Sequence, residues 1–262
     1  MYELNLVKRR KRRIIAAIVG GVGTTGVATF CIAAFLGHRT GSFTVALEGK
    51  SAQLTLSEKS DFKEKSSFLR VGELPGFQEY SYSWFRELGE GALDDEENDY
   101  TFGIKENSKG KKHTDFLKYT FFVKNIGVDP AEYDFSLKIK EVVATSNGQT
   151  LEDSFRVMVY DNGVPDVYAK RLQVPRVENG VADYRAPIST NENDPSNPFE
   201  GYAKMFASST EVMTQKAQHL EVNEIRKYTI VTWLEGFQAS GDGDTLRGAS
   251  IKLGVEINAY EN

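Results

Sequence analysis

The stretch Ser250-Ile-Lys-Leu-Gly-Val-Glu-Ile257 decides the fold class of this chain. Its apolar residues occupy every second position from Ile251 to Ile257, and the positions between them are Lys, Gly and Glu. Because successive side chains of a strand point to opposite faces, this period of two predicts a β-strand with one face on a core and the other in water. The stretch therefore indicates a sheet that is covered on one side.

Segments of similar character recur along most of the preceding sequence. They are rich in Val, Ile, Tyr, Phe and Thr, the residues that favour strands. The predicted strands are Ser42–Leu47, Gln53–Leu56, Tyr80–Phe85, Tyr100–Ile104, Tyr119–Val123, Phe135–Val143, Phe155–Tyr160, Val167–Leu172, Tyr228–Leu234 and Ser250–Ile257.

Turn signals separate several of these strands. The dipeptides Asn147-Gly148, Asn162-Gly163 and Asn179-Gly180 predict tight turns, and the polar stretches Gly89–Asp99 and Ala186–Glu200 predict loops. Strands do not alternate with helices in this pattern, so a parallel α/β sheet is disfavoured. The expected fold class is all-β, an antiparallel β-sandwich.

One segment, Ser208–Leu220, fits two structures. Ser, Thr and Glu near its beginning would cap a short helix with Val212, Met213, Lys216 and Leu220 in loose helical register. An irregular strand fits the same residues equally well. The sequence leaves both alternatives open.

The beginning of the chain predicts export. Six basic residues, Lys8–Arg13, run directly into 24 uncharged residues, Ile14–Gly37. A helix of that length spans about 36 Å, against roughly 30 Å of bilayer hydrocarbon, and flanking Lys and Arg stay on the cytoplasmic side. The expected organisation is a basic cytoplasmic region 1–13, one apolar helix 14–37 that serves as a transmembrane helix or export signal, and an extracellular domain 38–262.

Whether the apolar helix is retained or removed is open from the sequence. Its length favours a retained anchor, whereas the cluster of Gly20, Gly21, Gly23 and Gly26 resembles a signal that a signal peptidase would cut. A retained helix predicts a single-pass membrane protein with its N-terminus inside. A cleaved one predicts secretion to the cell surface.

Composition limits the partners of the outer part. Without residues 1–13 the chain has 26 Lys and Arg against 36 Asp and Glu, a net charge of −10, which disfavours nucleic acid. The single cysteine, Cys31, lies in the apolar segment, which excludes a disulfide scaffold outside it. An exported domain without disulfides suits a bacterial cell surface.

No catalytic constellation emerges from the sequence, so a non-enzymatic protein is expected. His38, His113 and His219 are scattered, and nucleophile-elbow and phosphate-loop motifs do not occur. Three acidic clusters, Asp94–Asp99, Asn191–Asp194 and Gly241–Asp244, offer the oxygen ligands that calcium prefers. We expect solvated loops there and no cofactor, with calcium as the alternative.

A family resemblance is carried by the run Phe206-Ala-Ser-Ser-Thr-Glu-Val212, by Tyr228–Gly236 and by the strand Ser250–Ile257. Its most specific element is Trp233-Leu234-Glu235-Gly236, and Gly41-Ser-Phe-Thr-Val45 matches the beginning of the family's first strand. Together these segments resemble the TasA/camelysin-type exported surface and biofilm-matrix proteins of Gram-positive bacteria.

The resemblance implies a jelly-roll sandwich that is exported, processed by a dedicated peptidase and assembled into matrix fibres or a surface coat. It also implies strand donation between subunits, with Phe43, Val45 and Leu47 as the inserted face. We expect Trp233 and Glu235 to be structural. Two functions follow: a TasA-like matrix or fibre subunit that self-associates through β-strands, or a membrane-tethered adhesin or carbohydrate-binding module.

Overall fold

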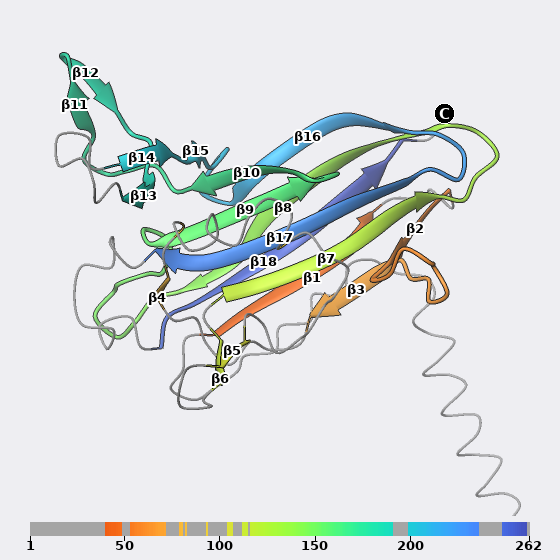
Figure 1. Cartoon of the computed structure of the whole chain (residues 1–262), viewed down its shortest axis with the longest axis horizontal. Coiled ribbons are helices and arrows are strands. Elements are labelled where there is room, and N and C mark those ends of the chain that lie inside the picture. The colour runs from red at the N-terminus through yellow and green to blue at the C-terminus, as the bar shows by residue number, and fades with distance from the viewer. Residues whose placement is uncertain are drawn as a thin grey trace, which may run out of the picture. The chain divides into compact units, whose positions relative to one another are not determined.

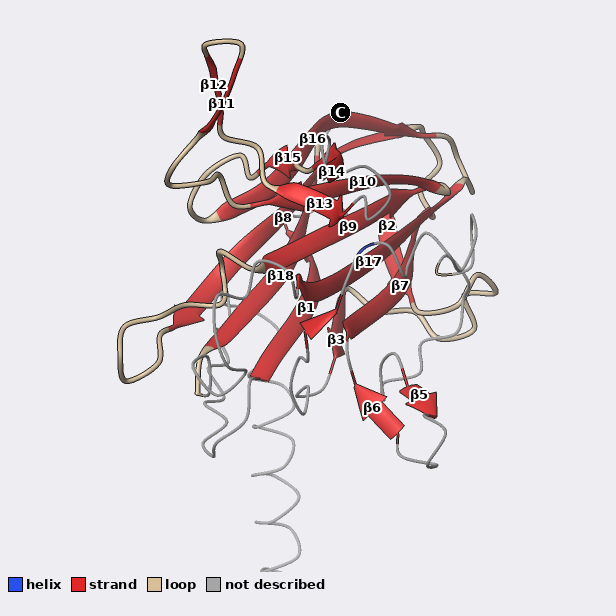
Figure 2. Ribbon diagram, turned by 60° about the vertical axis from the view of Figure 1, so that its left-hand side comes forward, coloured by secondary structure: helices blue, strands red, loops and turns tan. Residues whose placement is uncertain are grey.

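The computed structural model describes residues 40–48, 53–71, 79–80, 82, 93, 104–106, 112–114, 116–190, 199–235 and 248–260. This part of the chain is all-β (Figures 1 and 2), as the sequence predicts. All of these residues belong to one unit, Leu36–Asn262. The predicted apolar helix 14–37 and the basic region 1–13 lie outside the described residues. Within the described residues, no helix is long and apolar enough to cross a membrane.

Two large sheets carry the fold. The five-stranded sheet has the order β16 (Glu211–Leu220), β8 (Ala131–Val143), β18 (Ser250–Ala259), β1 (Thr40–Glu48) and β3 (Phe68–Val71). The seven-stranded sheet has the order β15 (Lys204–Met205), β10 (Val164–Ala169), β9 (Phe155–Asp161), β17 (Ile225–Glu235), β7 (Phe116–Asn125) and β2 (Leu54–Ser57), with β4 (Glu79–Tyr80) paired to β17.

Three two-stranded ribbons complete the described strands. They are β5 (Ile104–Glu106) with β6 (Lys112–Thr114), β11 (Arg176–Glu178) with β12 (Val181–Asp183), and β13 (Pro187–Thr190) with β14 (Phe199–Tyr202). The last pair corrects one prediction, because β13 and the beginning of β14 fall inside the stretch Ala186–Glu200, which we expected to be a loop throughout.

The two large sheets share one apolar core. The inward residues of β7, β9 and β17 meet those of β1, β8 and β18, and the ring of Tyr228 stacks on that of Phe135 with centroids 4.3 Å apart. The hydroxyls of Tyr133 and Tyr228 bond across the core at 2.9 Å. Burial of this kind contributes about 25 cal/mol per Å² of apolar surface, so this core is the main stabilising element.

Two of the predicted turns have the geometry that hairpins require. Asn162-Gly163 joins β9 to β10, and Asn179-Gly180 joins β11 to β12. All four residues have positive φ, between 47° and 88°, which matches the right-handed twist of the flanking strands. Gly148, in the third predicted turn, also has a positive φ, 78°.

The ambiguous segment Ser208–Leu220 contains a strand, not a helix. β16 pairs antiparallel with β8, and the register shifts between Glu211 and Met213 and again between Gln215 and Gln218. Asp134 stabilises the second shift by accepting bonds from the Ala217 amide (3.0 Å) and from Lys216 Nζ (2.6 Å). These irregularities interrupt the period of two, which is why the sequence fits a helix as well.

The sheets are not purely antiparallel. Among the described strands, β1 runs parallel to β18, β10 to β15 and β4 to β17. The remaining pairs of the two large sheets are antiparallel, as the sequence predicts.

Candidate self-association interface

Strand β1 lies inside the five-stranded sheet, between β18 and β3. It pairs in parallel with β18 along its whole length, from Thr40 opposite Ser250 to Glu48 opposite Asn258. On its other side, the segment from Phe43 to Ala46 pairs antiparallel with β3. β18 therefore has β8 on one side and relies on β1 to satisfy its backbone groups on the other.

The inward face of β1 enters the shared core. Val45 is 0% exposed, and the partly buried Leu47 packs against the same cluster. Phe43, the third residue of the predicted face, pairs through its backbone with Leu253 of β18 and Val71 of β3. All three predicted residues thus lie on β1, and two of them contact the core.

The outward face of β1 lies close to β18. A Cβ atom added to Gly254 would lie 3.2 Å from Thr44 Oγ1 and 2.7 Å from Lys140 Cε. Glycine is the residue that accommodates such an approach between neighbouring strands. Lys138 and Lys140 both pair with Glu256 on this face.

A short connection links β1 to the other sheet. β1 ends at Glu48 and β2 begins at Leu54 in the seven-stranded sheet, which leaves five residues between them. An extended connection of this length spans at most about 20 Å. The position of β1 relative to its own β2 is therefore limited by a tether with a defined maximum length.

The signature Trp233-Leu234-Glu235 lies at the end of β17 and divides between two cores. Leu234 enters the core shared by the sheets, whereas Trp233 belongs to a second apolar cluster on the opposite face of the seven-stranded sheet. Trp233 Nε1 donates to Glu235 Oε2 at 2.8 Å, and the amide of Tyr82 donates to the same oxygen at 3.2 Å. The indole also stacks on the Tyr82 ring, with centroids 6.1 Å apart.

Arg156 is the member of this cluster that the sequence did not predict. It lies opposite Trp233 in the register of β9 and β17, and it is 0% exposed. Its Nη1 donates to the carbonyls of Asp153 (3.1 Å) and Phe155 (3.0 Å). Burial lowers the pKa of Arg156 to about 10, and the nearby Glu235 carboxylate opposes that shift, so the guanidinium stays charged at neutral pH.

The sequence does not predict the burial of Arg156, because a charged side chain between the apolar Phe155 and Val157 predicts a position that faces water. A second layer covers it instead, and the Pro187 carbonyl accepts from Nη2 at 3.5 Å. Trp233 Nε1 and Glu235 Oε2 bond within the protein, which is the geometry of a packed structural cluster. Gly236, the last residue of the signature, lies outside the described residues.

The predicted metal ligands remain untested. The acidic clusters Asp94–Asp99, Asn191–Asp194 and Gly241–Asp244 lie outside the described residues. Within the part of the chain that the structure describes, no group of three or more His, Cys, Asp and Glu side chains could hold a metal ion. His219 bonds Glu221 at 3.0 Å, and this contact raises the pKa of the imidazole.

Comparison with known proteins gives few matches to this chain. No protein-family model and no curated protein matches the chain. Among solved structures, a family 123 glycoside hydrolase from Clostridium perfringens, studied for glycolipid glycan hydrolysis, is similar at 10% identity and a TM-score of 0.21. The similarity covers 55% of this chain and 21% of the hydrolase chain.

Proposed function

We propose that this chain is an exported structural protein of the cell surface, a TasA-like matrix or fibre subunit that self-associates through β-strands. In this proposal residues 14–37 serve export, and the two sheets form a jelly-roll-type sandwich outside the membrane. The subunit has a structural role and no enzymatic one.

The position of β1 carries the proposal. β1 is the first described strand, pairs with β18 from Ser250 to Asn258 and places Val45 in the core. If β1 left, β18 would present an unpaired edge and the core would present an apolar slot. Such an edge templates pairing with a strand from another chain, while alternate side chains fill the slot.

Exchange of β1 between copies costs little in contacts, because the incoming strand has the same sequence as the outgoing one. Every backbone bond to β18 and every core contact of Val45 is remade between chains. The chain that gives its β1 to a neighbour has an empty slot for a third copy. Repetition of this step would produce an open fibre.

A cross-strand disulfide tests the exchange. Ala46 of β1 lies opposite Glu256 of β18, so Ala46→Cys with Glu256→Cys, in a Cys31→Ser background, joins the two strands wherever they meet. In assembled material we expect a ladder of covalent oligomers on a non-reducing gel. The matched control is Ser136→Cys with Thr214→Cys, whose native hydroxyls lie 3.1 Å apart on β8 and β16. That pair should close only within one chain, and monomeric bands from both pairs would rule the exchange out.

The mature N-terminus decides between the fibre subunit and the membrane-tethered adhesin or carbohydrate-binding module. Mass spectrometry of the native cell-surface protein should find a terminus between Thr29 and Phe43, because cleavage there frees β1 to move. Recovery of residues 1–37 in the membrane fraction would favour the tethered module.

A further inference from the structure

The hairpin of β11 and β12 projects from the two large sheets (Figures 1 and 2). We name the segment from Arg171 to Arg185, which contains β11 and β12, the arginine hairpin. Its three valines are among the most exposed large apolar side chains of the described residues, with Val174 at 80%, Val177 at 71% and Val181 at 68%. Three exposed valines on one hairpin are the composition of a contact surface rather than of a solvated loop.

The charge of the arginine hairpin differs in sign from that of the outer part of the chain. It contains three arginines and two acidic residues, so its net charge is +1, whereas residues 14–262 carry −10. Arg176 and Arg185 both pair with Asp183 at 2.9 Å. Arg171 lies over the Tyr184 ring at 3.9 Å, which holds its guanidinium at the surface.

A second surface has the opposite charge. We name the segments 126–132 and 219–225 the acidic tip. They contain four carboxylates, Asp129, Glu132, Glu221 and Glu224, and neither segment contains Lys or Arg. The net charge of the acidic tip is therefore −4.

Asn125 joins the two segments of the acidic tip into one surface. Its buried side-chain amide donates to the carbonyls of Asp129 (2.9 Å) and Leu220 (3.0 Å). Its backbone bonds Asn223 (3.0 Å) and Glu224 (3.2 Å). These bonds fix the backbone of the two segments relative to each other.

Apolar side chains accompany the carboxylates here as well. Val128 is 87% exposed, and Ile126 and Val222 are also exposed. The acidic tip therefore has the same two components as the arginine hairpin, exposed aliphatic side chains and charge, but with the sign reversed.

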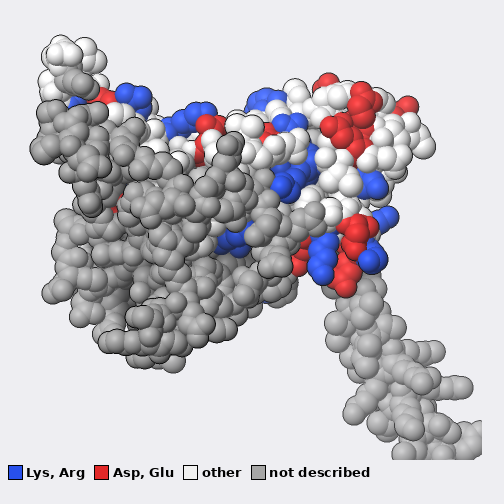
Figure 3. All heavy atoms as spheres, viewed as in Figure 1, with Lys and Arg blue, Asp and Glu red and all other residues white. Residues whose placement is uncertain are grey.

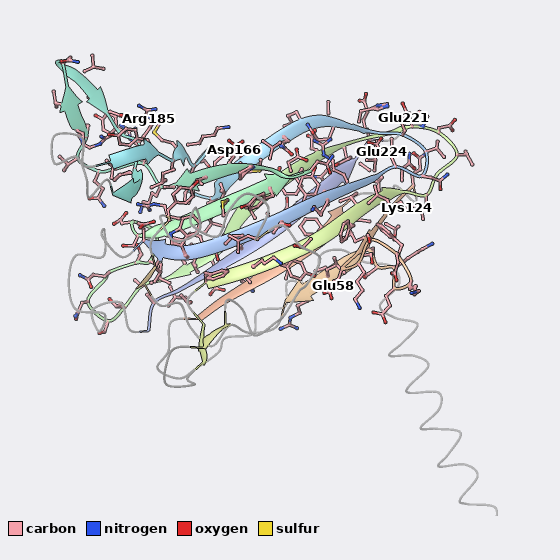
Figure 4. The ribbon with its side chains drawn as sticks, in the orientation of Figure 1. Glu58, Lys124, Asp166, Arg185, Glu221 and Glu224 are labelled. Carbon is pink, nitrogen blue, oxygen red and sulfur yellow. The ribbon has the colours of Figure 1, made fainter. Side chains whose placement is uncertain are left out.

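The two surfaces lie at opposite ends of the strands. β10 begins at the turn Asn162-Gly163, and at this end of the sheet Asp161 of β9 lies opposite Tyr228 of β17. The other end of β10 is Ala169, which comes just before the arginine hairpin. Figure 4 places Arg185 at one end and Glu221 with Glu224 at the other. Figure 3 shows acidic side chains gathered at that second end.

We propose that the arginine hairpin of one copy of this chain docks on the acidic tip of a second copy. The occupant is a second copy because the complementary surface is present on the chain itself, with matching apolar side chains and opposite charge. Since the two surfaces are different and lie at opposite ends, the contact is head-to-tail, and each copy can bind one neighbour at either end. The inference rests on the proposed self-association and adds a second interface, which orients the subunits between which β1 is exchanged.

Complementary charge reversal tests the contact in the mature chain by sedimentation velocity. The tip variant is Asp129→Lys with Glu221→Lys, and the hairpin variant is Arg171→Glu with Val177→Glu. Each variant alone should self-associate at least about tenfold more weakly than the wild type, because like charges oppose docking. An equimolar mixture should recover a 1:1 complex. Wild-type association of either variant alone, or failure of the mixture to recover association, would overturn the proposal.

The matched control reverses two exposed carboxylates outside both surfaces, Glu64→Lys with Glu141→Lys, and it should associate like the wild type. Wild-type association should also weaken between about 50 mM and about 500 mM salt, since screening acts on exposed charges. The disulfide-locked Ala46→Cys/Glu256→Cys monomer separates this proposal from strand exchange. Salt-sensitive association of the locked monomer would support docking even if strand exchange does not occur. Association that is insensitive to salt and is lost in the locked monomer would refute docking and leave strand exchange standing.

Discussion

Strands β17 and β1 both have neighbours on two sides, yet they differ in how firmly the fold holds them. β17 pairs with β7 and β9, every residue from Tyr228 to Glu235 is buried, and its two faces enter two different cores. Of the β1 side chains that the structure describes, Val45 and Leu47 contact the shared core. The difference teaches that burial on both faces makes β17 an anchor of the fold, and it is the reason why we propose β1 as the strand that is exchanged.

The strongest way to break this comparison is Trp233→Ala on β17. The change removes a fully buried indole and its bond to Glu235, so it should lower the free energy of unfolding by roughly 3–5 kcal/mol. Urea denaturation followed by circular dichroism measures the loss. Val128→Ala, at an exposed position, should change stability by less than about 0.5 kcal/mol. Equal effects of the two variants would contradict the anchoring role of β17.

Arg156→Ala tests whether charge as well as packing anchors β17. It leaves the Glu235 carboxylate buried without its cation, and we expect a loss of about 3 kcal/mol. Arg156→Met with Glu235→Gln removes both charges while keeping volume, and should cost less. If the double variant is less stable than Arg156→Ala in the same urea titration, the prediction is wrong, and the attraction between the two charges contributes more free energy than their burial costs.

Val45→Ala sharpens the comparison from the side of β1. Loss of two buried methyl groups should lower the free energy of unfolding by about 1–2 kcal/mol. Hydrogen exchange should quicken in β1, β3 and β18 and stay unchanged in β17, because β1 can open without global unfolding. Uniform acceleration through both sheets would show that β1 is not a separate unit.

Alkaline pH should weaken the polar bond that joins β17 to β8. Burial raises the pKa of Tyr133 from 10.0 to about 12. The hydroxyl of Tyr133 bonds that of Tyr228, and burial raises the pKa of Tyr228 as well. Because the folded pKa of Tyr133 lies above its ordinary value, its contribution is complete below pH 10 and is lost as the pH rises toward 12.

Tyr133→Phe should therefore cost about 1 kcal/mol at neutral pH and flatten the fall in stability above pH 10. Denaturation curves taken across that interval measure both effects. Tyr184→Phe, on the arginine hairpin, is the control that should retain the wild-type pH profile. An unchanged profile for Tyr133→Phe would place the alkaline loss elsewhere.

The smallest expected effect is that of Gly254→Ala, at the contact between β18 and β1. The added methyl group meets Thr44 and the flexible end of Lys140, so the cost should be about 0.5 kcal/mol. Gly201→Ala is the matched control, because its added Cβ would lie at an ordinary 3.6 Å from Ile188. Thermal unfolding of the two variants side by side resolves the difference.

The sequence predicted the parts of the fold that depend on neighbouring residues. Alternation located β18, and Asn-Gly dipeptides located the turns at Asn162-Gly163 and Asn179-Gly180, because both signals act within a few residues. The arginine hairpin was only half anticipated, since its turn was predicted but its three-residue strands are too short to leave a pattern.

What depends on distant partners could not be predicted. The parallel pairing of β1 with β18 joins residues 210 positions apart, Thr40 and Ser250, and no local pattern encodes it. The burial of Arg156 depends on a covering layer that includes Pro187, so its charge was the wrong signal. The predicted strand-donation face and the signature Trp233-Leu234-Glu235 fall on strands, but whether β1 moves between chains stays a prediction.

The parallel pairing of β1 with β18 also has a consequence in time. At roughly 5–20 residues per second, a ribosome that has completed Thr40 needs about 10–40 s to reach Ser250. During that interval a nascent β1 has no β18 of its own chain to pair with. If β1 is exchanged between copies as we propose, a growing chain can pair its β1 with a finished copy before its own β18 has been made, and the rate of synthesis then affects whether the strand stays within its own chain or is exchanged.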